Sequence, residues 1–202
     1  MNWIALFFIA FVLGSFPFSV WLGKIFLMTD VRKVGDGNPG AANVIRAGGK
    51  VVGLLALLLD VAKAALPVGL AYHNLQIRGL PMVLIAVAPI LGHAFSPFLG
   101  FKGGKGLATA LGVWIGLTIW KASLGALIGV LIGIVLTSIS GWAVMLGLIS
   151  VLTTLLVWIP DPIFLLVWVG ETLILMWTHR TDLQQGLKMR PWLAKYLAIF
   201  RK

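Results

Sequence analysis

The chain has 202 residues, of which 60% are hydrophobic and 11% charged, and its mean hydropathy is +1.03. An ordinary soluble domain carries about 25% charged residues, so this composition predicts one all-α integral membrane domain over 1–202. The net charge of +10 does not indicate nucleic acid, because basic residues also orient membrane helices. The lack of cysteine excludes disulfides and thiolate chemistry. We expect neither a metal nor a cofactor, and a chain of this size can function as a monomer.

Seven apolar segments are expected to cross the membrane as helices, over residues 3–26, 51–72, 80–99, 106–120, 122–138, 142–159 and 162–178. About 20 residues of helix cross a hydrocarbon core of roughly 30 Å. The first segment is expected to be a retained span and not a cleaved signal peptide. The uncharged run from Ala122 to Pro160 is too long for one span, so we divide it at the turn 137–141. After Pro191 the sequence predicts a short amphipathic helix, 191–202, on the membrane surface.

Basic residues gather on one side of these spans, which predicts the orientation of the chain. Only Arg78 and Lys121 fall on the opposite side. The N-terminus is therefore expected outside and the C-terminus in the cytoplasm. Three polar regions, 29–50, 100–106 and from 179 onwards, would then face the cytoplasm together, as a cytoplasmic active site would require. The basic residues expected on that side are Lys24, Arg32, Lys33, Arg46, Lys50, Lys102, Lys105, Arg180, Lys188, Arg190, Lys195, Arg201 and Lys202.

The turn FKGGKG, residues 101–106, combines two lysines with three glycines. Glycine allows successive backbone N–H groups to converge on an anion, and ammonium groups add charge that a phosphate can meet. Lys102 and Lys105 could instead be ordinary positive-inside anchors, but an anchor needs no glycines. We therefore interpret Lys102, Gly103, Gly104 and Lys105 as a phosphate site. Arg46, followed by Gly48 and Gly49, repeats the same combination in the loop 29–50.

Polar residues inside or beside the apolar segments have two interpretations each. His93 is costly in such a segment unless it is hydrogen-bonded or functional. Asp60 and Lys63 share one helical face and can neutralise each other; like Glu171, they are interpreted as structural. Asn38 and Asn43 either orient a substrate or cap turns. His179 and Arg180 stand where the last span leaves the membrane, and Arg180 could simply reach the lipid headgroups.

Two glycine-rich stretches do not fit nucleotide-binding motifs. Residues 35–40 match G-x-G-x-x-G but follow a membrane segment instead of a strand, which excludes a dinucleotide fingerprint. The FKGGKG turn lacks the glycine that a P-loop has five residues before its Gly-Lys-Ser/Thr.

The ordered motifs of the chain resemble those of the bacterial PlsY family. They comprise Gly14, Ser15 and Pro17 in the first span, D-V-R-x-x-G-x-G-N-x-G-A-x-N-x-x-R over 30–46, Asp60 with Lys63, GH-x6-GFKGGKG-x-AT over 92–109, and HR at 179–180. The resemblance covers nearly the whole chain. It implies a seven-helix enzyme of the inner membrane that transfers an acyl group from acyl phosphate to the 1-hydroxyl of glycerol 3-phosphate, giving lysophosphatidic acid and phosphate in the first step of phospholipid synthesis.

The resemblance also implies the residues of the site. His93, Lys105 and His179 are the expected catalytic residues, although a substrate phosphate oxygen could replace His93 as the proton acceptor. The phosphate groups would bind Arg46, Lys102, Gly103, Gly104, Lys105, Asn38, Asn43, Ser140 and Arg180. No serine or cysteine nucleophile is needed, because acyl phosphate is already activated. The acyl chain would lie in a groove between helices that opens to lipid.

Four positions depart from the family pattern: Asp36 replaces a serine, Ala42 a threonine, Asp182 an asparagine and Gln185 an arginine. A carboxylate near a phosphate disfavours binding. Asp36 and Asp182 are therefore expected to point away or to pair with Arg32 or Arg180, or the acceptor differs from glycerol 3-phosphate. Two alternatives remain open: an acyltransferase for another phosphorylated alcohol, and a membrane transporter for a small anion.

Overall fold

The computed structural model describes residues 2–199, and its regular elements in that range are helices, apart from one isolated bridge between Thr137 and Met189. The longer helices are α1 Trp3–Ser15, α2 Phe18–Leu27, α4 Lys50–Gly69, α5 Leu80–Ala94, α6 Leu107–Thr118, α7 Lys121–Leu136, α8 Ser140–Trp158 and α9 Pro162–Thr178. The shorter ones are η1 Val31–Lys33, α3 Ala41–Arg46, η2 Leu70–Asn74, η3 Pro97–Leu99, α10 Arg180–Leu183 and α11 Pro191–Ile199. The all-helical prediction is confirmed for this part of the chain.

Four segments among the described residues are long and apolar enough to cross a membrane. They are Trp3–Leu27, Lys50–Asn74, Leu80–Leu99 and Ser140–Trp158. Three further apolar helices, α6, α7 and α9, have 12, 16 and 17 residues. These are shorter than the roughly 20 residues that a perpendicular span needs. The expected count of seven spans and their orientation therefore stay predictions.

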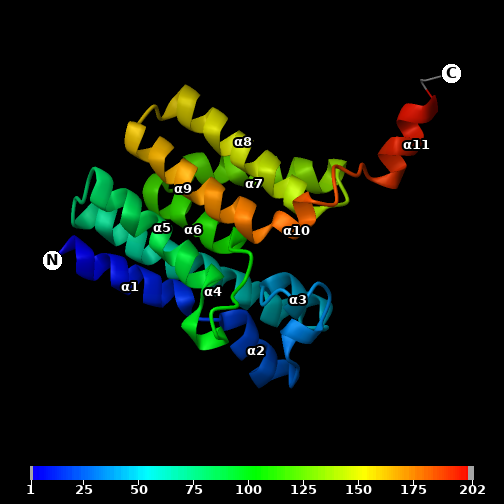
Figure 1. Cartoon of the computed structure of the whole chain (residues 1–202), viewed down its shortest axis with the longest axis horizontal. Coiled ribbons are helices and arrows are strands. Elements are labelled where there is room, and N and C mark those ends of the chain that lie inside the picture. The colour runs from blue at the N-terminus through cyan, green and yellow to red at the C-terminus, as the bar shows by residue number, and fades with distance from the viewer. Residues whose placement is uncertain (1, 200–202) are drawn as a thin grey trace.

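The first apolar segment is not the single helix expected over 3–26. It breaks between α1 and α2, where Phe16, directly before Pro17, adopts an extended conformation; a proline disfavours helical geometry at the residue before it and lacks the N–H of the helix ladder. The loop expected over 29–50 also contains α3, which packs against α4. The predicted surface helix 191–202 corresponds to α11, which leads away from the bundle in Figure 1. Residues 200–202 of that prediction lie outside the described residues.

The closest helix pairs are α1 with α5, α4 with α6, and α7 with α8, and glycine lies at each crossing. A Cβ on Gly14 of α1 would collide with the backbone of Pro89 in α5, and one on Gly112 of α6 with the carbonyl of Val61 in α4. Small residues of this kind let membrane helices approach closely. Figure 1 shows α7, α8 and α9 on one side of the bundle and α1, α4 and α5 on the other.

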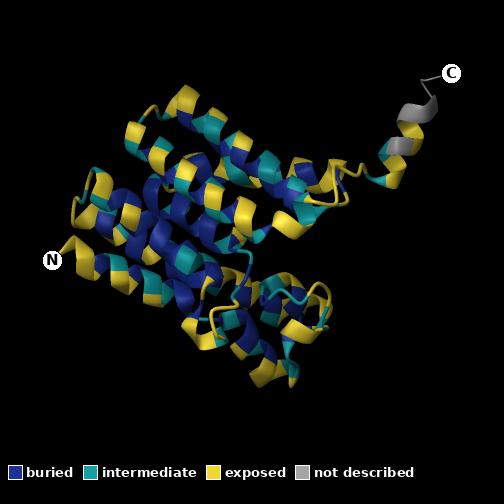
Figure 2. Ribbon diagram, viewed as in Figure 1, coloured by how far each residue is buried: buried dark blue, intermediate teal, exposed yellow. Residues whose placement is uncertain are grey.

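The buried residues lie in the interior of this bundle. Figure 2 shows buried residues concentrated where α4, α5 and α6 meet the other helices, while the outer faces of the bundle are exposed. Trp114, Met82 and Ile85 are among the largest fully buried side chains. The exposed residues on the outer faces include many large apolar side chains, such as Leu58, Leu131 and Leu173. This pattern fits a surface that contacts lipid.

A buried polar network connects the break in the first segment to α4 and α5. Lys63 donates hydrogen bonds to Asp60 Oδ1 at 2.7 Å and to the carbonyl of Phe16 at 3.0 Å, and it lies 2.8 Å from His93 Nδ1. Ser19 of α2 donates to the other Asp60 oxygen. Side chains of Lys63 and Asp60 are only 2% and 3% exposed. The predicted pairing of Asp60 with Lys63 is confirmed, and we call the group the Lys63 network.

Replacing Lys63 with methionine is expected to destabilise the protein by about 3–5 kcal/mol, because it leaves a buried carboxylate and the Phe16 carbonyl without a partner. The loss would appear as a lower midpoint of thermal unfolding in detergent. Lys24→Met, at an exposed lysine of α2, is the matched control and should leave the midpoint nearly unchanged. Equal midpoints for the two variants would contradict a stabilising role for the network.

Candidate functional site

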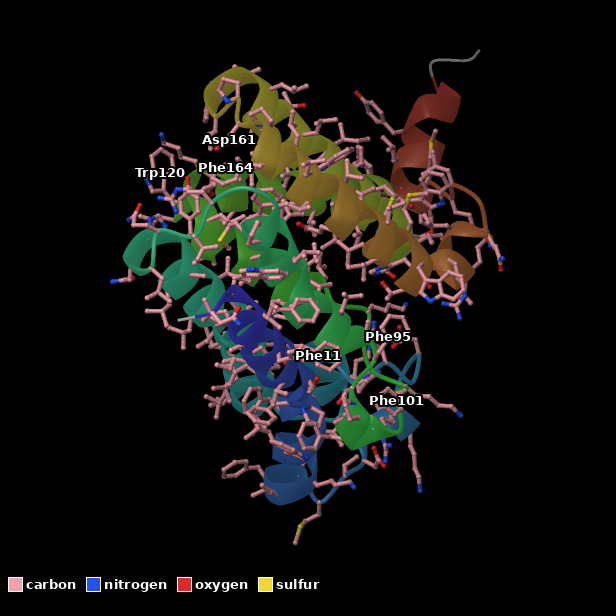
Figure 3. All side chains as sticks on the ribbon, turned by 60° about the vertical axis from the view of Figure 1, so that its left-hand side comes forward. Phe11, Phe95, Phe101, Trp120, Asp161 and Phe164 are labelled. Atoms are coloured by element: carbon pink, nitrogen blue, oxygen red, sulfur yellow. The ribbon has the colours of Figure 1, made fainter. Side chains whose placement is uncertain are left out.

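One cavity of about 380 Å³ extends from polar loops into the helix bundle. Polar groups from distant parts of the sequence line its mouth, namely Asp36, Asn38, Arg46, Lys105, Ser140 and His179. The other walls are mostly apolar side chains of α6, α7, α8 and α9, including Leu111, Val130, Val144, Leu148 and Leu175. Three buried polar residues also line the cavity, namely Asp60, Glu171 and the predicted catalytic residue His93. Figure 3 marks the two ends of the bundle: Phe95 and Phe101 lie near the polar loops, and Trp120 and Asp161 at the other end. The cavity is therefore amphipathic along its length.

Lys105 lies between two carboxylates at this mouth. Its Nζ is 3.0 Å from Asp36 Oδ2, 2.9 Å from Asp182 Oδ2 and 3.1 Å from Asp182 Oδ1. Ser140 donates to Asp182 Oδ2 at 2.7 Å, and Asn43 donates to Asp36 Oδ1 at 3.0 Å. We call this arrangement the Lys105 bridge. It connects the loop before α3, the turn before α6 and the helix α10.

The Lys105 bridge keeps all three of its groups charged. Burial raises the pKa of each carboxyl, but the hydrogen bonds and the charge of Lys105, with further bonds from Asn43 to Asp36 and from Ser140 to Asp182, together outweigh it and hold the pKa of both below the usual value. Burial likewise lowers the pKa of Lys105, and the bonds to Asp182 and Asp36 outweigh it and raise that pKa. The expected alternatives for the two carboxylates, that they point away or pair with Arg32 or Arg180, are wrong. Arg32 pairs instead with Asp30, at 2.6 Å.

The expectation that the amides of Gly103 and Gly104 form an anion site is also wrong for this structure. Gly103 N–H donates to the carbonyl of Ala94 at 3.0 Å, and Gly104 N–H to that of His93 at 3.1 Å. Both amides therefore cap carbonyls at the end of α5, which a helix leaves without partners. Glycine is required at 103 because a Cβ there would collide with the His93 carbonyl. Neither residue lines the cavity.

The start of α6 offers backbone donors in their place. Gly106, Leu107 and Ala108 line the cavity directly after Lys105, and no described side chain caps this helix. The first N–H groups of a helix have no partner within it and attract anions. Gly106 adopts a φ of 84°, a left-handed conformation that glycine adopts without strain. The turn therefore brings an ammonium and a helix N-terminus together at the mouth of the cavity.

The two predicted histidines differ in the ring nitrogen that carries hydrogen. His179 Nδ1 lies 2.9 Å from the carbonyl of Leu175, which can only accept, so Nδ1 carries the hydrogen and Nε2 keeps its lone pair. Burial lowers the pKa of His179, which keeps its imidazole neutral near pH 7. His93 Nδ1 accepts from Lys63, whose other two hydrogens go to Asp60 and the Phe16 carbonyl. His93 is therefore a donor through Nε2.

The remaining predicted residues separate into two groups. Arg46, Asn38 and Ser140 line the cavity. Asn43 and Arg180 do not line it, nor does Lys102, whose side chain is exposed.

The two asparagines hold the loops around the cavity. Asn38 Oδ1 accepts from the Lys105 backbone at 2.9 Å. Asn43 is 1% exposed, accepts from Arg46 at 2.7 Å and donates to the carbonyl of Asn38. Arg180 lies over the ring of Trp177, 4.5 Å from its centroid, and donates a hydrogen bond to the Trp177 carbonyl.

Comparison with known proteins identifies the family. A family model described as glycerol-3-phosphate acyltransferase matches residues 4–189. A protein of that name from Anaeromyxobacter dehalogenans (strain 2CP-C) is 49% identical over 135 residues, 64% of this chain and 66% of the relative, just under two thirds of its length. The glycerol-3-phosphate acyltransferase of Methylobacillus flagellatus is 39% identical over 180 residues, covering 88% of this chain and 90% of the relative.

Solved structures agree with the sequence matches. The crystal structure of PlsY (YgiH), described as an integral membrane glycerol 3-phosphate acyltransferase in its glycerol 3-phosphate form, superposes with a TM-score of 0.82 at 32% identity, over 91% of this chain and 90% of that one. A second form of PlsY, with lysophosphatidic acid, gives a TM-score of 0.81 at 30% identity, with the same coverage. The resemblance inferred from the motifs is thus confirmed, and the chain belongs to the PlsY family of membrane glycerol-3-phosphate acyltransferases.

Proposed function

We propose that this protein transfers an acyl group from acyl phosphate to the 1-hydroxyl of glycerol 3-phosphate, giving lysophosphatidic acid and inorganic phosphate. The supporting observation is a cavity with a charged mouth and mostly apolar walls. An acyl phosphate has the same division, with a dianionic group at one end and a long alkyl chain beyond it. The active site faces the cytoplasm of a bacterial inner membrane that the chain crosses seven times. The excess of basic residues on the loops that carry the site supports this orientation.

The reaction needs positioning and charge stabilisation more than a covalent nucleophile. The 1-hydroxyl oxygen of the acceptor attacks the acyl carbonyl carbon, and the bond from that carbon to the phosphate oxygen breaks. Lys105 and the N-terminus of α6 stabilise the charge of the leaving phosphate, and Arg46 binds the acceptor phosphate. Nε2 of His179 accepts the hydroxyl proton, since its lone pair is uncommitted to the backbone. Holding both substrates in one cavity accelerates the reaction further, because it keeps the hydroxyl close to the carbonyl carbon.

Lys105→Ala is expected to reduce kcat for phosphate release from palmitoyl phosphate by about 100-fold or more, the loss typical of removing one charge-stabilising donor. Release should depend on glycerol 3-phosphate and yield lysophosphatidic acid. Lys102→Ala is the matched control, because Lys102 belongs to the same turn but does not line the cavity. We expect less than a threefold effect there. Equal losses in both variants would contradict the assignment, and release without acceptor dependence would favour another phosphorylated alcohol.

The Lys105 bridge has to open before a phosphate can contact Lys105, because both carboxylates occupy its hydrogens. Asp182→Asn removes one competing charge while preserving a hydrogen-bonding side chain. We expect the KM for glycerol 3-phosphate or the acyl phosphate to fall several-fold, with little loss of kcat. Asp30→Asn serves as the control, since Asp30 pairs with Arg32 away from the cavity. A higher KM in Asp182→Asn would mean that the carboxylate assists phosphate binding instead of opposing it.

The pH dependence should report the neutral imidazole of His179. Because burial lowers its pKa from the ordinary 6.5, the base form prevails at neutral pH, and kcat should be level from about pH 7 upward and fall as acid protonates the ring. His179→Gln should lower kcat and remove that acid limb, whereas His73→Gln, on the exposed η2, should retain it. An unchanged acid limb in His179→Gln would assign the proton to a phosphate oxygen of the substrate.

A further inference from the structure

The proposed reaction places negative charge on two groups, and the residues assigned so far meet only one of them. Attack by the hydroxyl moves charge onto the acyl carbonyl oxygen as well as onto the leaving phosphate. Lys105 and the N-terminus of α6 stabilise the phosphate. The carbonyl oxygen has no assigned donor, and His93 is a buried polar residue of the same cavity that the reaction leaves unused.

The hydrogen bonds of Lys63 determine which ring nitrogen of His93 carries the hydrogen. The ammonium lies 2.8 Å from Nδ1 and can only donate, so Nδ1 accepts and the hydrogen is on Nε2. The other two hydrogens of Lys63 go to Asp60 and to the Phe16 carbonyl, which fixes the ammonium in place. The one lone pair of the neutral ring is thus committed. His93 is therefore a donor and is not free to take the hydroxyl proton.

The donor on Nε2 opens onto the cavity. Nε2 completes no hydrogen bond within residues 2–199, and unlike Nε1 of Trp114 it is not sealed inside the protein. The side chain of His93 is 7% exposed and lines the cavity, so a ligand atom there can reach the ring. Native proteins satisfy nearly all buried polar groups. A donor left open at a cavity therefore points to a ligand that supplies an acceptor.

The ring of His93 lies against the turn that carries Lys105. A Cβ on Gly104 would collide with Nε2, and one on Gly106 would lie 3.9 Å from Cδ2 of the ring. Lys105 and Gly106 both line the cavity. In an acyl phosphate, one oxygen atom separates the carbonyl carbon from the phosphorus. A phosphate that binds Lys105 and the start of α6 therefore brings the carbonyl beside His93, and the alkyl chain continues between the apolar walls.

We propose that His93 is a catalytic residue whose Nε2–H donates to the acyl carbonyl oxygen, and that Lys63 is the positioning residue that keeps the hydrogen on Nε2. The inference deepens the proposed function and rests on it for the reaction. The hydroxyl oxygen bonds to the carbonyl carbon, the electron pair of the C=O bond moves to the oxygen beside His93, and the proton goes to His179 Nε2. The pair then returns, and the bond from the carbon to the phosphate oxygen breaks. His93 stays neutral throughout, as a donor that polarises a carbonyl can.

Lys63 acts on His93 through its charge as well as its position. A cation at Nδ1 draws electron density from the ring, which strengthens Nε2–H as a donor. Asp60 lies 2.7 Å from the ammonium and neutralises it, so the network can stay inside the bundle. Nitrogen NMR of the unmodified protein should show hydrogen on Nε2 of His93, whose signals are identified by their loss in His93→Asn. Hydrogen on Nδ1 would overturn the role of Lys63.

Two substitutions separate the donor from the network. His93→Asn preserves an acceptor for Lys63 but is too short to place a donor at Nε2, so kcat for acyl transfer should fall about 100-fold. The KM for the acyl phosphate should stay within about threefold, because a donor that acts mainly in the transition state changes kcat. The amide nitrogen of His93→Gln reaches the position of Nε2, and this variant should recover kcat to within about tenfold of the unmodified protein.

His73→Asn is the matched control, since His73 is exposed on η2 and does not line the cavity. Its kcat should equal that of the unmodified protein. The acid limb of the pH profile should persist in His93→Asn, and its loss there would make His93 the proton acceptor and overturn the proposal. Unchanged kcat in His93→Asn, or no recovery in His93→Gln, would overturn it as well.

A measurement without turnover separates this inference from the reaction on which it rests. A β-keto phosphonate, in which a methylene replaces the bridging oxygen of the acyl phosphate, keeps the carbonyl but cannot release phosphate. A hydrogen bond from Nε2 weakens the C=O bond, so the infrared stretching frequency of an isotopically labelled carbonyl should be lower in the unmodified protein than in His93→Asn.

The two proposals then fail in different ways. A lower frequency in a protein that consumes no acyl phosphate would support the His93 donor, and only the proposed reaction would fail. Acyl transfer to glycerol 3-phosphate, with the same carbonyl frequency in the unmodified protein and in His93→Asn, would overturn the donor alone.

Discussion

The ammonium of Lys63 is the interaction on which the arrangement of the site depends. In a membrane interior every backbone polar group needs a partner inside the protein. The break at Pro17 frees the carbonyl of Phe16, and Lys63 binds it together with Asp60 and His93. These contacts join the first apolar segment, α4 and α5 around one charge. Because Asp60 neutralises that charge within 2.7 Å, the network can lie inside the bundle.

The end of α5 connects the Lys63 network to the cavity. The carbonyls of His93 and Ala94 accept from Gly104 and Gly103, so the turn before α6 is fixed to the same helix that closes the Lys63 network. Lys105 and the N-terminus of α6 follow directly. The sequence suggested that Gly103 and Gly104 bind phosphate directly. Their N–H groups instead hold the turn that places Lys105 and the N-terminus of α6 at the cavity. The site is positioned by backbone contacts that tolerate no side chain at 103 and 104.

Local spacing in the sequence was sufficient to predict several of these features. The spacing of Asp60 and Lys63 places them on one helical face, and the glycine-rich turn drew attention to the loop whose Lys105 and Gly106 line the cavity. The break at Pro17 was missed because hydropathy continues across it. The partners of Asp36 and Asp182 were missed because Lys105 is 69 and 77 residues away along the chain. Residue types likewise cannot reveal whether the N–H groups of Gly103 and Gly104 serve a ligand or a helix end.

Two carboxylates at the proposed phosphate site are compatible with an acyltransferase once the charges are considered together. Arg46 and Lys105 face Asp36 and Asp182, so the charges at the mouth of the cavity nearly cancel and the two carboxylates orient the lysine. A neutral alcohol cannot displace these ion pairs, whereas a dianionic phosphate exchanges one strong partner of Lys105 for another. We therefore expect the Lys105 bridge to lower the affinity of the site for phosphate groups while favouring charged over neutral substrates. A carrier for small anions would need polar groups along its whole path. The charged side chains that line this cavity are Asp36, Arg46 and Lys105 at its mouth, together with Asp60, which Lys63 neutralises, and Glu171.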